Sequence, residues 1–317
     1  ASSAAIYGAR GAFGVILVTT KSAKDGDVSI SYNGSVSVHS RTVWPELVTN
    51  GYEWTTGYMD AWNGYYNGSK ELNTHINNIV PYSTEWYTEL GRRNVDGSLE
   101  RIRINDAGIY EYFGNTDWTR LFFKDSNISH EHNISVSGGN SKARYYVSGR
   151  FYDQDGIYKV GDERFRQYNV RAKGDIQVTD WLKISNNLNF VVVDYHQPML
   201  YYSQQLVPRM LEHAGQPVSV PTNPDGTWTY AAVLNGYAAF TEGTSYQQED
   251  KFTLTESFSL QADIIKDVLK LQGDLSYLYG RNSRDRVTNM YTSYTAPNST
   301  TTVNETQGST LQNVRYD

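Results

Sequence analysis

The sequence predicts an all-β protein whose antiparallel strands close into a transmembrane β-barrel. Three observations support this prediction. Aromatic residues make up 14% of the 317 residues, with 26 Tyr and 26 Gly, which is typical of many strands joined by turns. Several segments alternate apolar and polar residues over about ten positions, close to the ~9–11 residues of a membrane-crossing strand. Short and long connections alternate between these segments, as in barrels with turns at one end and loops at the other.

Composition excludes several other classes of protein. The net charge is −6 and no basic run occurs, so the electrostatic footprint of nucleic-acid binding is missing. The chain has no cysteine, which excludes disulfide scaffolds, thiolate metal sites and cysteine nucleophiles. No stretch approaches the roughly 18 consecutive apolar residues of a membrane-spanning helix, so a helical membrane protein is excluded.

Residues 1–26 differ from the rest of the chain. Gly8, Gly11 and Gly14 precede the apolar run 15–18, which predicts a glycine-rich turn leading into a buried strand. A phosphate-binding loop places its glycines between a strand and a helix N-terminus, so the reversed order here favours tight backbone packing. The chain opens without Met or a signal segment, and we expect it to be a piece of something longer.

From residue 27 onward we expect seven or eight strands. Between residues 28 and 38, apolar side chains fall on one face of the first strand and polar side chains on the other. The same period of two returns over residues 143–151, 168–178, 182–192, 252–264 and 269–279. Asn186 and Glu256 are polar exceptions on the apolar faces. One face of the predicted sheet is therefore apolar and the other is polar and hydrated.

The connections set the orientation of the predicted barrel. Residues 138–141 and 178–181 form tight turns. The long excursions span residues 40–127, 153–166, 194–250 and 281–310. An upward first strand puts every long excursion on the outer side. In the first excursion, Asn50 is a candidate helix N-cap with Glu53 three residues later, and we expect a short helix there with Trp54 on its aromatic face.

Two other classes of protein fit the alternation as well. A soluble, secreted, carbohydrate-binding β-sandwich would show the same period and would fold alone in water. Part of a barrel would not, because it leaves open strand edges and a lipid-facing surface. A surface glycosidase is a third possibility, although no pair of loop carboxylates stands out as acid and nucleophile.

The sequence offers little support for a catalytic site or a metal site. His130 and His132 share one strand face while Glu131 points away, which offers at most half a metal site and favours an ordinary strand end. The segment 153–156 resembles the start of a calcium loop, but Ile157 stands where an oxygen ligand is needed. Neither Gly-x-Ser-x-Gly nor His-Glu-x-x-His occurs. We therefore expect no enzyme, no cofactor and no metal site.

The order of several motifs resembles one family. The segment Ala5-Ile6-Tyr7-Gly8-Ala9-Arg10-Gly11, within residues 4–21, is similar to the end of the plug domain in SusC/RagA-type TonB-dependent outer-membrane transporters of Bacteroidota. Early barrel markers of that family resemble Asn115-Thr116-Asp117-Trp118, Ser135-Val136-Ser137-Gly138-Gly139, Arg144-Tyr145-Tyr146, Asp153-Gln154-Asp155-Gly156 and Thr179-Asp180-Trp181-Leu182-Lys183. The chain departs from the family at Phe13, where a small polar residue is usual, and at Asp155, where Glu is commoner.

The resemblance implies a complete protein with an N-terminal plug inside a barrel of about 22 strands. Residues 1–26 would end the plug, with Gly8, Arg10, Gly11 and Gly14 serving plug geometry, and residues 27–317 would supply the first seven or eight strands. The implied function is energy-coupled import of oligosaccharides across the bacterial outer membrane, with oligopeptides as the alternative cargo. The implied partners are a SusD-like surface lipoprotein lid, the TonB–ExbB–ExbD complex and membrane lipid.

Aromatic residues in the long excursions are the predicted cargo-binding residues. Flat rings suit sugar faces or peptide side chains, although such rings also form interfacial girdles and loop cores. The predicted set is Trp44, Trp54, Trp62, Tyr65, Tyr66, Trp228 and Tyr230. Arg144, Arg150 and Arg171 face the predicted lumen, where contacts with the plug are favoured over contacts with cargo.

Overall fold

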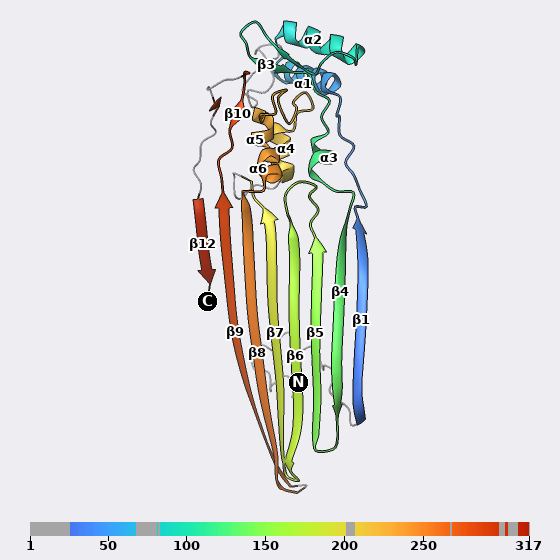
Figure 1. Cartoon of the computed structure of the whole chain (residues 1–317), viewed down its shortest axis with the longest axis vertical. Helices are drawn as coiled ribbons and strands as arrows, with labels where there is room; N and C mark the ends of the chain where they lie inside the picture. Colours follow the sequence, from blue (N-terminus) through green and yellow to red (C-terminus); the bar gives the residue numbers. More distant parts are fainter. Residues whose placement is uncertain are drawn as a thin grey trace.

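The computed structural model describes residues 26–67, 81, 83–200, 207–266, 268–297, 302–303 and 310–316. Its main part is one eight-stranded antiparallel sheet in the order β1-β4-β5-β6-β7-β8-β9-β12, with helical connections gathered at one end (Figure 1). The sheet strands are β1 (Gly26–Ser40), β4 (Ser126–Gly139), β5 (Ala143–Asp155), β6 (Arg164–Thr179), β7 (Leu182–Pro198), β8 (Tyr246–Ile265), β9 (Leu269–Thr288) and β12 (Thr310–Tyr316). The glycine-rich turn and the strand predicted before residue 26 lie outside the described residues.

The sheet confirms the predicted antiparallel arrangement of the strands. Each strand neighbours the next one in sequence, except that β4 follows β1 and β12 follows β9, with two short strands of a separate sheet between the members of each pair. The register is regular, with Tyr168 of β6 opposite Val192 of β7, for example. Among the described residues no second sheet packs against this one, so the arrangement does not fit a β-sandwich.

The two faces of the sheet follow the predicted alternation. On the apolar face large side chains are exposed, such as Val36 at 72% and Leu275 at 68%. The opposite face carries paired polar groups, including the ion pair of Arg150 and Glu131 at 2.7 Å. We call these the apolar face and the polar face. A sheet that exposes this much apolar surface on one side has a face suited to lipid.

Three of the long excursions are shorter than predicted because the strands continue further. β5 and β6 leave only residues 156–163 between them, β7 and β8 leave 199–245, and β9 extends to Thr288. The extra strand length escapes sequence analysis because both faces are polar there: Glu249 points to one face and Asp250 to the other. The alternation that marks a strand therefore disappears before the strand ends.

The connections fold into a compact group of short elements. These are α1 (Gly51–Tyr66), α2 (Thr84–Val95), β2 (Ile102–Ile104), β3 (Tyr110–Tyr112), α3 (Trp118–Phe122), α4 (Val207–Ala214), α5 (Tyr230–Leu234), α6 (Tyr237–Glu242), β10 (Ser293–Tyr294) and β11 (Thr302–Val303). Their shared core includes Trp86, Phe113 and Phe122, all at most 1% exposed. Only the first helix was predicted; α3 to α6 have at most eight residues and are too short to show a period, and the 12-residue helix α2 was missed. In the described part of the chain, no helix combines the length and the apolarity needed to cross a membrane.

Candidate binding site at the loop end of the sheet

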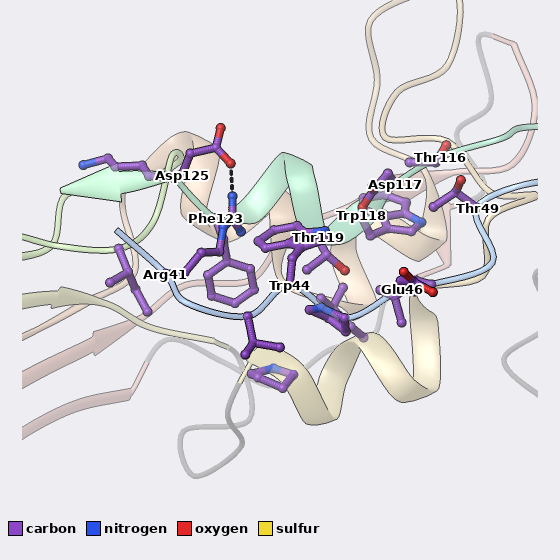
Figure 2. A pocket seen from close by; sticks show the side chains of 18 of the residues that line it. Arg41, Trp44, Glu46, Thr49, Thr116, Asp117, Trp118, Thr119, Phe123 and Asp125 are labelled. Atoms are coloured by element: carbon purple, nitrogen blue, oxygen red, sulfur yellow. Dashed lines mark hydrogen bonds and ion pairs between the residues drawn. The ribbon is translucent and has the colours of Figure 1, made fainter. Parts of the chain in front are cut away.

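A cavity of about 950 Å³ lies at the loop end of the sheet, and we call it the mouth pocket. Its lining comes from the β1–α1 connection (41–49), the α3 region (116–125) and the α4 region (208–217). His39 and Asn127, which lie opposite each other on β1 and β4, bring the polar face of the sheet to the same cavity. Figure 2 shows side chains from these distant segments converging on one space.

The start of α1 is fixed against the wall of this pocket. The Asn50 side chain accepts hydrogen bonds from the backbone N–H groups of Tyr52 (2.9 Å) and Glu53 (3.0 Å), which confirms the predicted N-cap. The next residue, Gly51, is buried and donates its N–H to Asn115 Oδ1 at 2.8 Å. A Cβ at Gly51 would collide with the Gly114 carbonyl oxygen, so only glycine lets the helix start this close. Trp54 is thereby held at the pocket.

Two guanidinium groups contact the ring of Trp44. Cζ of Arg41 is 3.1 Å from the centroid of the indole, and Cζ of Arg120 is 5.1 Å from it. Arg41 is ion-paired with Asp125 (Figure 2), and Arg120 Nε lies 3.4 Å from Asp117 Oδ2. Each cation–π contact contributes about 0.5–2 kcal/mol, depending on how far the groups are desolvated. These contacts fix the β1–α1 connection as one wall of the pocket.

The α3 wall is anchored by Trp118, which is 2% exposed. Its indole Nε1 donates to the Gln216 carbonyl oxygen at 3.2 Å and to Ser219 Oγ at 3.1 Å. Asp117 caps α3 by accepting from Arg120 N at 2.9 Å. Trp118 therefore ties the first long excursion to the excursion between β7 and β8, and the mouth pocket forms where the two meet.

The lining of the mouth pocket suits non-covalent binding. Val43, Leu47 and Leu211 supply apolar surface beside the rings of Trp44 and Trp54, while exposed Glu46 and Glu212 add polar groups. Pockets that combine apolar walls with a few polar groups bind ligands through shape and orienting hydrogen bonds. The chemistry fits a ligand with flat or apolar faces and polar edges.

Four aromatic side chains form a ladder along α1. Ring centroids are separated by 5.5 Å between Trp54 and Tyr58, 6.3 Å between Tyr58 and Trp62, and 4.5 Å between Trp62 and Tyr66. Residues four apart share a helix face, which explains the spacing. Burial raises the pKa of Tyr58. Tyr65 stands outside the ladder, 82% exposed, with its ring edge-on to Tyr66 at 4.8 Å.

The other two predicted aromatic residues lie elsewhere in the connections. Trp228 is half-buried and its Nε1 donates to Glu242 Oε1 at 2.5 Å. Tyr230 packs against the shared core. The turn before them is ordered by Asp225, whose pKa is lowered by the hydrogen bond from the Thr227 hydroxyl. Of the seven predicted aromatic residues, Trp44 and Trp54 line the mouth pocket, and the structure places the rest outside its lining.

The three predicted arginines all lie on the polar face. Arg150 pairs with Glu131, Arg144 Nη2 lies 3.8 Å from Asp175 Oδ2, and Arg171 Nε donates to Asn187 Oδ1 at 3.3 Å. Their place on the sheet follows from the period of two. Their contact with a plug stays a prediction.

The paired histidines contact neighbouring strands, although His130 Nδ1 is buried without a hydrogen-bond partner among the described residues. His130 and His132 do share a face, with ring centroids 5.3 Å apart, while Glu131 points to the other side. The Tyr32 hydroxyl and His132 Nδ1 are hydrogen-bonded at 2.7 Å. His130 Nε2 lies 3.6 Å from Asp153. The described residues hold no group of three or more His, Asp or Glu side chains placed to bind a metal ion.

Several residues of the mouth pocket were missed by sequence reasoning. Asp117 and Trp118 belong to a motif that matched the family, but nothing in the sequence assigned them to a cavity. Leu211 and Glu212 lie in a helix too short to show a period. The one usable signal is the glycine at position 51 directly after an N-cap, which indicates a close approach of backbones.

The sequence of the chain is similar to parts of several known proteins. No family model matches the chain. TonB-dependent receptor SusC of Bacteroides thetaiotaomicron is 30% identical over 193 residues, covering 60% of this chain and 15% of SusC. TonB-dependent receptor P26 of Formosa agariphila is 25% identical over 232 residues, covering 72% of this chain and 19% of that protein. The chain is similar to part of SusC and of other TonB-dependent receptors.

Solved structures show the same fold. A chain from the structure of the RagAB peptide transporter matches with a TM-score of 0.58 and 20% identity, covering 90% of this chain and 32% of that one. A second match is the RagAB peptide importer in its closed-closed state, with a TM-score of 0.57 and 20% identity over 89% of this chain and 31% of that one. The chain thus spans 15% of SusC and about a third of the solved chain, and the expected family resemblance is confirmed.

Proposed function

We propose that this chain is part of a TonB-dependent transporter that imports oligosaccharides across the bacterial outer membrane. The observation that carries the proposal is the mouth pocket, where Trp44 and Trp54 meet the polar face of a sheet whose other face is apolar. An apolar outer face and a polar inner face are what a membrane barrel with a hydrated lumen requires. The similarity to TonB-dependent receptors supports the same conclusion.

The lining of the mouth pocket supports a sugar as cargo. Aromatic rings contact the flat faces of a pyranose, while carboxylates and amides bind its hydroxyl groups. Trp44 and Trp54 supply the rings, and Glu46, Glu212 and Asn127 supply polar groups at the same cavity.

The proposed transporter works with partners outside this chain. A SusD-like lipoprotein would cover the loop end of the sheet and deliver cargo to the mouth pocket. The TonB–ExbB–ExbD complex would supply energy to displace the plug, of which residues 1–26 are the proposed end. The apolar face would lie against membrane lipid, so the location is the outer membrane.

Oligopeptides are the second candidate cargo. The apolar part of the pocket, with Val43, Leu47 and Leu211, suits peptide side chains as well as sugar faces. The proteins of similar fold are described as peptide importers.

Mass spectrometry of the cargo that co-purifies with the full-length complex tests the proposal. The complex is extracted from its native outer membrane, and the bound material is released and weighed. Ladders at the spacing of sugar units are the expected result. Mixed peptide masses would overturn the oligosaccharide proposal in favour of peptide import.

A further inference from the structure

A second, smaller hollow lies on the polar face at the opposite end of the sheet. Its volume is about 230 Å³, and it includes Arg144 near the start of β5 and Asp175 near the end of β6. The mouth pocket includes Asn127, near the start of β4. At about 3.4 Å per residue, the length of β4 separates the two hollows by about 40 Å. Both lie on the face that would line a lumen.

Short polar side chains form the floor of this hollow. Ser185 of β7 lies opposite Ser259 of β8, and Ser257 lies opposite both Asn187 of β7 and Ser276 of β9. Directly opposed residues have side chains on the same face of a sheet. We call this floor, Ser185, Asn187, Ser257, Ser259 and Ser276, the polar shelf. It presents hydroxyl and amide groups across three adjacent strands.

Cations dominate one side of the polar shelf. Arg144 Nη2 and Lys183 Nζ each lie 3.8 Å from one carboxylate oxygen of Asp175. Lys173 stands two residues along β6 and also lines the hollow. Arg171 follows on the same face, bonded to the neutral side chain of Asn187. Arg144, Lys173 and Asp175 therefore line this side of the hollow, and Lys183 and Arg171 add positive charge beside it on the same face.

On the opposite side of the polar shelf lies a carboxylate, that of Asp274, which already accepts hydrogen bonds from neighbouring side chains. Asp274 accepts from Ser259 Oγ at 2.6 Å and from Gln272 Nε2 at 3.3 Å. A ligand in the hollow would thus meet an excess of positive charge on the β5–β6 side and hydroxyl groups beneath it. Charge-assisted bonds to an anion are stronger than neutral ones, so the cationic side decides orientation.

We propose that the polar shelf binds an acidic oligosaccharide, with its carboxylate or sulfate group at Arg144 and Lys173 and its hydroxyl groups over the serine floor. The inference rests on the proposed import function and makes that function more specific. It gives the cargo path a second position, downstream of the mouth pocket, that favours anionic over neutral glycans.

The test uses the full-length transporter, produced with its partners in the native outer membrane. The probes are the acidic glycan recovered from the wild-type complex and the same glycan with its charge removed by methyl esterification or desulfation. Uptake of each is measured in cells carrying wild type, R144Q/K173Q or the charge-preserving R144K/K173R. Lys270→Gln is the matched control, because Lys270 lies on the polar face near Asp263 at 3.5 Å and outside the hollow.

The double glutamine variant should lower uptake of the acidic glycan about tenfold, the loss expected for one charge-assisted hydrogen bond. Uptake of the uncharged form should stay within about twofold of wild type, and R144K/K173R and K270Q should behave like wild type. Uptake is normalised to the amount of folded protein in the membrane, so poor assembly does not imitate the effect.

The other outcomes separate the two proposals. Neutral sugar ladders from the wild-type complex would overturn the acidic-glycan inference and leave oligosaccharide import standing. Equal loss of uptake for charged and uncharged forms would also overturn the inference, because the cations would then serve the structure alone. Peptides in place of glycans would overturn both proposals.

Discussion

Asn186 and Glu256 are hydrogen-bonded to each other in the middle of the apolar face, with Asn186 Nδ2 donating to Glu256 Oε1. Glu256 lies opposite Leu188 and Tyr277, so apolar side chains surround the pair. Sequence analysis marked both residues as exceptions to the alternation. The structure shows that the two exceptions satisfy each other, which is how a polar side chain is tolerated on a surface suited to lipid.

Replacing only one residue of this pair should destabilise the protein more than replacing both. Asn186→Leu leaves the Glu256 carboxyl without its donor, and we expect a loss of about 1–3 kcal/mol in the free energy of unfolding. N186L/E256L removes both polar groups and should restore stability to near the wild-type value. The heat-induced mobility shift of the full-length protein in detergent gives Tm for each variant. A double variant less stable than N186L would contradict the expectation.

The start of α1 offers a second prediction. Gly51→Ala places a Cβ against the Gly114 carbonyl oxygen and 2.8 Å from Val218 Cγ1, so the helix must move away from the pocket wall. We expect the free energy of unfolding to fall by about 1–3 kcal/mol, which is the usual cost of forcing extra atoms into a packed site. Limited proteolysis of the connections in the full-length protein measures the change.

Gly57→Ala is the matched control on the same helix. A Cβ at Gly57 would meet nothing within 4 Å, so the substitution should be neutral or should stabilise α1 by up to about 1 kcal/mol. Equal protease sensitivity for G51A and G57A would show that the close approach at Gly51 does not matter.

The sheet was predictable from the sequence because strand alternation is a local property. Each apolar residue between 168 and 178 needs only its neighbours two positions away to reveal its face. The same logic failed at the loop end of β8, where Glu249 and Asp250 make both faces polar. Where a strand continues past the apolar part of the sheet, its residues are polar on both faces. They therefore leave no periodic signal, although the backbone is still a strand.

The mouth pocket was only partly predictable because it depends on contacts between distant segments. Trp44 and Trp54 were identified as aromatic residues of a long excursion, which is a property of composition. That Trp118 donates to the Gln216 carbonyl oxygen, across about a hundred positions of sequence, has no local signature. The same holds for Gly51 against Gly114, where a glycine hints at a close approach but not at its partner.

Cargo binding gives a third prediction. Trp44→Ala removes a ring from the mouth pocket and frees Arg41 and Arg120 from their shared contact, and we expect at least about tenfold weaker binding of the co-purified cargo. Trp181→Ala is the control, because Trp181 is 51% exposed in the turn between β6 and β7, at the far end of the sheet. Calorimetry on the full-length complex compares the two. Unchanged affinity in W44A would remove the pocket from the proposed cargo path.

The fourth prediction concerns acid sensitivity of α2. Glu89 accepts from Arg92 Nη2 at 3.1 Å and from Arg93, and Arg103 Nη1 lies 3.8 Å away. The hydrogen bond from Arg92, followed by that from Arg93, holds the pKa of Glu89 below its usual range. Because the folded-state pKa is lowered, the stabilisation is present above the ordinary Glu pKa of about 4.3 and is lost as the pH falls through the lowered value.

Hydrogen exchange of α2 in the full-length protein should therefore accelerate as the pH falls from about 5 to about 3, after correction for the intrinsic exchange rate. Glu89→Gln cannot be ionised, so its exchange should already be faster at pH 5 and should change less on acidification. Glu85→Gln is the control, because Glu85 is 84% exposed and its nearest described cation, Arg103, is 3.9 Å away. An identical pH response in E89Q and wild type would place the acid-sensitive group elsewhere.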